Sequence, residues 1–142
     1  MKKLVLTLLA LVAFSMAASA QITQIKSTQL PNQARTTISR AWNNAPIVDA
    51  WRNKEGKHVE YKATVEDGSV IKFAANGQWI EVHSYSGVPN SLLPKALLTH
   101  LDKYYEGQYV ITATKTTRRY RVELSDGTKL EFNSKGAFQA FL

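Results

Sequence analysis

Three histidines, His58, His83 and His100, are the side chains best suited to acid–base or metal chemistry in this 142-residue chain. No pair of them has the spacing of metal ligands, and the chain has no cysteine, so the pattern does not indicate a zinc site. Two local acid–base pairs exist, Glu81 with His83 and His100 with Asp102. Residues two apart share a face on a strand but not on a helix, and no nucleophile motif accompanies either pair. We therefore predict no catalytic residue, no metal site and no cofactor.

Serine and glycine motifs give no better case for catalysis. Ser84-Tyr85-Ser86-Gly87 lacks the residue order of a nucleophile elbow. Every glycine falls in a predicted turn, loop or helix end, so none belongs to a phosphate-binding loop. We predict that the protein is not an enzyme, with a hydrolase or metal enzyme as an alternative.

Basic residues suggest a binding surface instead. The densest basic run is Thr117-Arg118-Arg119-Tyr120-Arg121. Because side chains alternate along a strand, Arg119 and Arg121 are predicted to point to the other face from Tyr120. A sheet face of mixed charge is most often simply solvated, but an uncovered face also offers a broad platform for a partner. Trp and Tyr residues without a core position are the better interface anchors. The predicted partner-binding residues are Arg119, Arg121, Lys129, Lys62, Trp51 and Tyr85.

Two helical segments precede the strands that would carry these side chains. Apolar residues recur at helical spacing from Leu30 to Ala45, and Pro46 ends the stripe. The motif Thr28-Gln29-Leu30-Pro31 that opens it returns 63 residues later as Ser91-Leu92-Leu93-Pro94. The hydroxyl residue of each motif is predicted to cap its helix, with the proline inside the first turn.

Alternation of apolar and polar residues after each helix is typical of half-buried strands. The dipeptides Asp67-Gly68 and Asp126-Gly127 are those that tight two-residue hairpins prefer, because both central residues need a positive φ. Second turns are predicted at Asn76-Gly77 and Lys135-Gly136, and an earlier strand near Ile47–Arg52 and near Tyr109–Lys115.

These patterns predict an α+β fold: a tandem duplication of a helix followed by a four-stranded antiparallel meander, with the helices packed on one face of the sheets. The two repeats span about 28–84 and 91–142. Either repeat alone would bury too little surface to be stable, so we expect one domain over residues 21–142. Gln21 to Ser27 is expected to be a loosely held arm.

The second half carries a recognisable motif: Val88-Pro89-x-x-Leu92-Leu93-Pro94, then Tyr120-x-Val122-x-Leu124-x-Asp126-Gly127-x-x-Leu130-x-Phe132 and Lys135-Gly136. The first half matches it with Phe73-x-x-Asn76-Gly77-x-Trp79-x-x-Val82. This pattern resembles the PepSY-like family, also described as β-lactamase-inhibitor-like periplasmic proteins. The resemblance implies an exported protein whose fold is similar to that of inhibitors that grip an enzyme with a curved sheet. It carries over no catalytic residue.

The N-terminus predicts export. Lys2 and Lys3 precede an apolar run, and Ala18-Ser19-Ala20 has the form of a signal-peptidase site, so residues 1–20 are predicted to be a signal peptide cleaved after Ala20. The apolar run is too short for a transmembrane anchor, and the mature chain would be periplasmic or secreted. Removal of the two lysines lowers the formal net charge from +7 to +5. Such a chain meets no genomic nucleic acid, and its basic balance favours anionic envelope surfaces or an acidic protein partner.

We therefore expect an exported, non-enzymatic periplasmic interaction protein, inhibitor-like by its resemblance, that binds a periplasmic or secreted protein through its open sheet face. The alternative is a binder of an anionic envelope ligand, either a lipid head group or a glycan.

Overall fold

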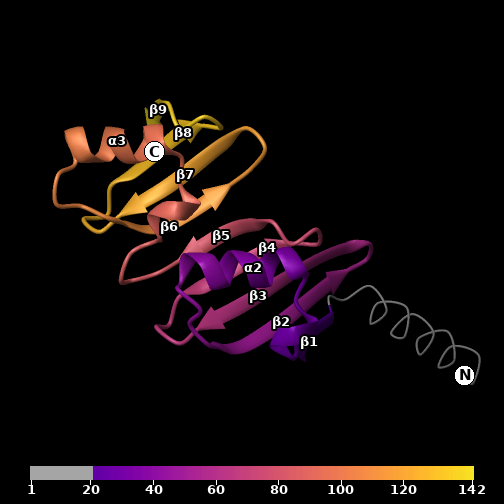
Figure 1. Ribbon diagram of the computed structural model, residues 1–142. Coiled ribbons are helices and arrows are strands. Elements are labelled where there is room, and N and C mark those ends of the chain that lie inside the picture. The colour runs from indigo at the N-terminus through magenta and orange to yellow at the C-terminus, as the bar shows by residue number, and fades with distance from the viewer. Residues whose placement is uncertain (1–20) are drawn as a thin grey trace, which may run out of the picture.

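A computed structural model describes residues 21–142, in which nine strands form one antiparallel sheet whose spatial order follows the sequence (Figure 1). The predicted signal peptide, residues 1–20, lies outside the described residues. The strands are β1 (Gln21–Ile25), β2 (Ile47–Glu55), β3 (His58–Val65), β4 (Val70–Ala74), β5 (Trp79–His83), β6 (Val110–Lys115), β7 (Arg119–Leu124), β8 (Lys129–Asn133) and β9 (Phe138–Phe141). The helices in this range are α2 (Asn32–Ala41) and α3 (Lys95–Tyr104), each preceded by a short 3₁₀ turn, η1 (Ser27–Gln29) and η2 (Asn90–Leu92).

The predicted fold class is wrong. The described chain is mostly β, and its strands form one continuous sheet rather than tandem units of a helix and a four-stranded meander. The expected loose arm is strand β1, whose residues from Gln21 to Ile25 pair with β2. Strand β5 also pairs directly with β6, which joins the two halves of the sheet. Side-chain periodicity did not reveal these pairings, because backbone N–H and C=O groups make them and nearly every residue carries both.

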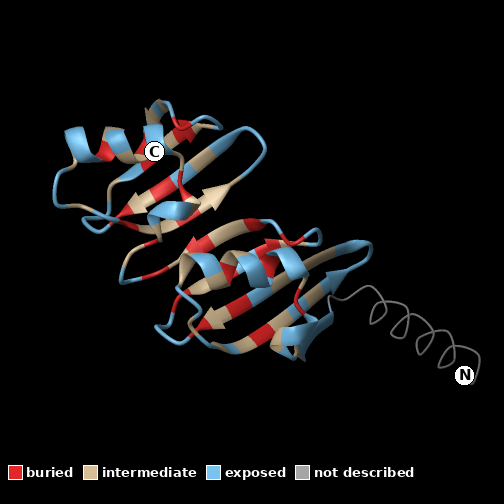
Figure 2. Cartoon of the chain, in the orientation of Figure 1, coloured by how far each residue is buried: buried red, intermediate tan, exposed pale blue. Residues whose placement is uncertain are grey.

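One face of the sheet is apolar across its width. Because side chains alternate along each strand, residues paired in register point to the same face. Helices α2 and α3 cover this apolar face and contribute the buried side chains of Ala34, Ile38, Leu97 and Leu101. Figure 2 shows buried positions both on the strands and on the helices. The central row of buried residues runs through Ala50, Ala63, Ile71, Val82, Ala113, Val122 and Leu130.

The helices begin later than predicted, because the prolines set their start. Leu30 and Leu93, each directly before a proline, have extended backbones with ψ of 149° and 146°. The proline ring disfavours helical geometry in the preceding residue, so no helix can run through either position. Thr28 and Ser91 therefore lie in η1 and η2 and cap neither α-helix.

The hairpins and their glycines are confirmed, but the two-residue turn is wrong. Asp67 and Asp126 have no positive φ, and three residues separate the bonded pairs Val65–Ser69 and Leu124–Thr128. Gly68 and Gly127 have φ of 88° and 90°, as the Asp-Gly dipeptides predict. The carboxylate of Asp67 accepts a hydrogen bond from the Ser69 N–H at 2.8 Å, and Asp126 accepts one from the Thr128 N–H at 2.9 Å. Each aspartate thus stabilises the turn through the backbone two residues on.

Aromatic packing closes the junction between β5 and β6 on the helix-covered side. The rings of Trp79 and Tyr120 lie 6.2 Å apart, and the Lys115 ammonium lies 4.3 Å from the centre of the Trp79 indole. Burial lowers the pKa of Lys115 and raises the pKa of Tyr120, since it disfavours the charged form of each. The two halves of the sheet therefore share side-chain packing as well as backbone pairing.

Candidate binding face on the open side of the sheet

The face of the sheet opposite α2 and α3 is polar, and we call it the open face. Strand pairing aligns its side chains in rows that cross both halves of the molecule. One row contains Trp51, Lys62, Lys72, Glu81, Thr114, Arg121 and Glu131. The neighbouring row contains Asp49, Thr64, Val70, His83, Thr112, Glu123 and Lys129.

The structure places the predicted binding residues at or beside this face. Trp51, Lys62 and Arg121 lie in the first row, Lys129 lies in the second, and Arg119 is two residues from Arg121 on β7. At about 4.8 Å between neighbouring strands, β2 and β7 lie roughly 24 Å apart. The residues therefore form two groups, one in each half of the sheet.

Tyr85 follows β5 and is 79% exposed. Its ring packs edge-on against the His83 ring, with a centroid distance of 4.6 Å. Because His83 belongs to the second row, Tyr85 lies beside the open face, in the loop that follows β5.

The N-terminal group surrounds a hollow of about 360 Å³ on the open face. Trp51 and Lys62 line it, together with Ile22 from β1 and Asn53 from β2. The side-chain oxygen of Asn53 (Oδ1) is buried and accepts no hydrogen bond from the described residues. Neither Ile22 nor Asn53 could be recognised from the sequence, because β1 was not predicted and an asparagine on a strand carries no motif.

The charged residues around this hollow are only partly paired. Lys72 Nζ lies 3.1 Å from a carboxylate oxygen of Glu81, and His58 Nε2 lies 3.0 Å from Glu60, which also lines the hollow. Lys62 is exposed and belongs to none of the ion pairs within residues 21–142. The hollow thus offers a cation without an ion pair and an indole in one place.

The C-terminal group is organised by Glu131. Its carboxylate accepts hydrogen bonds from Arg119 Nη1 at 2.8 Å and from Arg121 Nε at 3.3 Å. These two guanidinium groups hold the pKa of Glu131 below its ordinary value, with the Arg119 hydrogen bond as the largest cause. A hollow of about 430 Å³ adjoins the two arginines at the β6–β7 hairpin.

The histidines make separate local contacts. His83 Nδ1 contacts the Thr112 hydroxyl at 2.9 Å, while the His100 ring stacks on Phe138 at 4.7 Å between α3 and β9. Within residues 21–142, no three His, Asp or Glu side chains gather closely enough to hold a metal ion. Ser84, near His83 in the sequence, is buried and accepts a hydrogen bond from the Ser69 hydroxyl at 2.8 Å.

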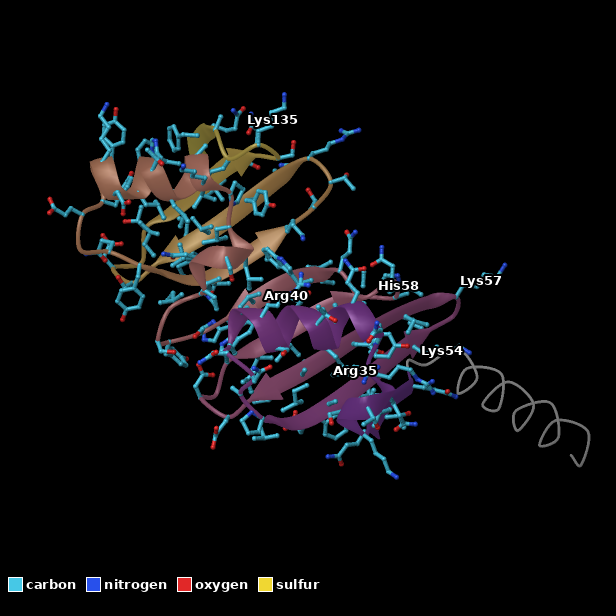
Figure 3. All side chains as sticks on the ribbon, in the orientation of Figure 1. Arg35, Arg40, Lys54, Lys57, His58 and Lys135 are labelled. Atoms are coloured by element: carbon cyan, nitrogen blue, oxygen red, sulfur yellow. The ribbon has the colours of Figure 1, made fainter. Side chains whose placement is uncertain are left out.

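Basic side chains also occur away from the open face. Figure 3 shows Arg35 and Arg40 on α2, on the opposite side of the sheet, and Lys57 at the tip of the β2–β3 hairpin. The overall basic charge is therefore not a marker of the open face by itself. Neither α-helix in the described part of the chain combines the length and apolar content needed to cross a bilayer.

Solved structures with the same fold include three proteins of Bacteroides. A protein of B. thetaiotaomicron, described as a candidate calcium-regulated periplasmic protein, is 23% identical with a TM-score of 0.80, covering 85% of this chain and 96% of its own. A candidate periplasmic protein of B. vulgatus is 23% identical with a TM-score of 0.79, covering 86% and 97%. A second from B. vulgatus, described as of unknown function, is 21% identical with a TM-score of 0.78, covering 87% and 99%. At this identity the likeness shows a shared fold. None of the curated proteins matches the chain.

Sequence comparison agrees with the motifs in the C-terminal half. The family described as beta-lactamase-inhibitor-like, PepSY-like matches residues 59–140. This range runs from β3 to β9, more than half of the chain, and includes both Asp-Gly hairpins. The resemblance seen in the sequence is confirmed, and the chain belongs to the PepSY-like family.

Proposed function

We propose that this PepSY-like protein is an exported, non-enzymatic binding protein that holds a protein partner on its open face. The family description as inhibitor-like supports a binding role, and the description of its structural neighbours as periplasmic supports a place in the cell envelope. The predicted signal peptide is consistent with both.

The hollow beside Trp51 is the observation that carries this proposal. A partner could cover the Trp51 indole and Ile22 with an apolar group while an acidic group pairs with Lys62. Aromatic side chains beside a few well-placed polar groups are typical of the residues that dominate binding energy.

The charge of the molecule favours an acidic partner. The formal net charge of the mature chain is +5, and Lys62 lies beside the hollow without an ion pair in the described residues. A positive surface attracts an acidic protein and so speeds its association. Added salt screens this attraction and should slow the association. Arg119, Arg121, Lys129 and Tyr85 would extend the contact beyond the hollow.

A capture experiment tests the proposal. The purified mature chain, immobilised, would retain a specific acidic protein from the envelope fraction, and the double variant Trp51→Ala/Lys62→Glu would lose it. The variant Arg40→Glu is the matched control, because Arg40 is exposed on α2, away from the open face.

The affinity of the recovered protein would then be measured by titration. Loss of a central aromatic anchor weakens binding by about 2 kcal/mol or more, which is a factor of roughly thirty. Equal retention by all three proteins, or recovery of no specific protein, would contradict the proposal.

A further inference from the structure

The β6–β7 hairpin forms a second hollow on the open face, whose chemistry differs from that beside Trp51. Its volume is about 430 Å³. Its walls come from the end of β6, the connecting turn and the start of β7. They consist of three arginines and three threonines: Arg118, Arg119, Arg121, Thr114, Thr116 and Thr117.

The charges at this hollow do not balance. Glu131 is the carboxylate that Arg119 and Arg121 share, while Arg118 takes part in none of the ion pairs of residues 21–142. Three guanidinium groups against one carboxylate leave a local charge of +2.

The contacts with Glu131 also orient both arginines. Arg119 uses Nη1 and Arg121 uses Nε in these contacts. Since a guanidinium has five N–H donors, most remain available to a ligand.

The turn adds a fixed hydroxyl. Thr116 Oγ1 accepts hydrogen bonds from the backbone N–H groups of Arg118 at 3.3 Å and Arg119 at 3.2 Å. These two bonds occupy the acceptor side of the hydroxyl, so its own hydrogen remains to be donated. The side chain lines the hollow, where this hydrogen complements the guanidinium donors.

We propose that this hollow binds a phosphate monoester group. A phosphate monoester carries about −1.5 to −2 charges at pH 7, which matches the local +2, and its three oxygens accept hydrogen bonds from several donors at once. Arginine pairs with phosphate in the two-point geometry that its planar fork allows. The phosphate could be part of a lipid head group or of a free small molecule, and the same chemistry recognises both.

Calorimetric titration with phenyl phosphate tests the site. Arg118→Gln and Arg121→Gln are each expected to weaken binding about tenfold or more, the loss of one charge-assisted hydrogen bond. Arg40→Gln changes the net charge equally on the exposed side of α2 and is expected to change the affinity less than about twofold, because distant charges are screened. Phenyl sulfate, with a single negative charge, should bind more weakly than phenyl phosphate.

Arg121→Gln removes an ion pair with Glu131 and could destabilise the hairpin. Arg118→Gln removes no ion pair of the described residues, so its effect on affinity reports the binding site alone. Absence of phenyl phosphate binding, or an equal effect of Arg118→Gln and Arg40→Gln, would overturn the proposal. So would equal affinity for the phosphate and the sulfate.

Vesicles separate the two sources of phosphate. Binding to phosphatidylcholine vesicles that contain phosphatidic acid, a monoester, with loss in Arg118→Gln, would indicate a lipid head group. Binding of phenyl phosphate without binding to these vesicles would indicate a soluble ligand. If phosphatidylglycerol, a diester, is bound as well as phosphatidic acid and Arg118→Gln has no effect, the attraction is to any anionic surface and the proposal is wrong.

Different variants test the phosphate site and the proposed partner binding, so either can be wrong without the other. The variant Trp51→Ala/Lys62→Glu leaves the β6–β7 hairpin unchanged and should keep its phosphate affinity. Arg118→Gln leaves the hollow beside Trp51 unchanged.

Discussion

Glu131 shows how one side chain sets the geometry of its neighbours on the open face. It is 17% exposed, and it lies in register with Arg121 and within hydrogen-bond distance of Arg119. Exposed ion pairs contribute little to stability, but one carboxylate that binds two arginines restricts both guanidinium groups at once. The same contact therefore prepares the face for a ligand while adding only modestly to the fold.

The variant Glu131→Gln should lose a pH-dependent part of the stability. The pKa of Glu131 is lowered in the folded chain, so its stabilising effect is fully present above the ordinary value of 4.5 and is lost as the pH falls through the lowered folded value. We expect the wild type to be more stable than Glu131→Gln at pH 7, with the difference shrinking below pH 4.5. Denaturant unfolding of both proteins across this range measures it, and a pH-independent difference would contradict the assignment.

At the element scale, two glycine turns that connect strands also pack against the helices. Gly77 and Gly136 follow β4 and β8 with φ of 86° and 91°. A Cβ at Gly77 would lie 3.0 Å from the Cβ of Pro31, and one at Gly136 would lie 2.7 Å from the Cβ of Pro94. These turns thus press against the start of α2 and α3, where only glycine allows the close approach.

Gly136→Ala should therefore destabilise the protein more than Gly127→Ala. Both glycines have positive φ, which costs an alanine about 1 kcal/mol. A Cβ at Gly127 meets open space, whereas one at Gly136 also lies 2.9 Å from the backbone nitrogen of Leu97, so overpacking adds roughly 1–3 kcal/mol. Thermal and denaturant unfolding compare the two variants. Equal losses would mean that α3 can move away from the turn without penalty.

At the scale of the whole molecule, the β5–β6 junction decides whether the halves unfold together. Val82 pairs with Ala113 across it, and Trp79 from one half contacts Tyr120 and Lys115 from the other. Burying the Lys115 ammonium is unfavourable, but its contact with the face of the indole offsets part of that cost.

Trp79→Ala should destabilise both halves equally. Trp79 is 6% exposed, and removal of a buried tryptophan costs about 3–5 kcal/mol. Native-state hydrogen exchange at β3 and β8 would report each half, and we expect the same loss of protection in both. Tyr85→Ala, at an exposed loop position, is the neutral control. Loss of protection confined to β3 would show that the halves unfold independently.

The sequence by itself determined the features that depend on neighbouring residues. Alternation placed Lys62, Arg121 and Lys129 on one face, and the Asp-Gly dipeptides predicted the positive φ of Gly68 and Gly127. These features follow from local sterics, which act within a few residues and leave a pattern in the chain.

Only the tertiary structure decided how distant segments meet. The pairing of β1 with β2, which brings Ile22 to the hollow beside Trp51, and the pairing of β5 with β6 both depend on backbone groups that carry no sequence signature. The sharing of Glu131 between Arg119 and Arg121 likewise depends on the register of β7 with β8. The residue types on the open face are thus a property of the sequence. Which of them lie together, and which remain without a partner, is a property of the assembled sheet.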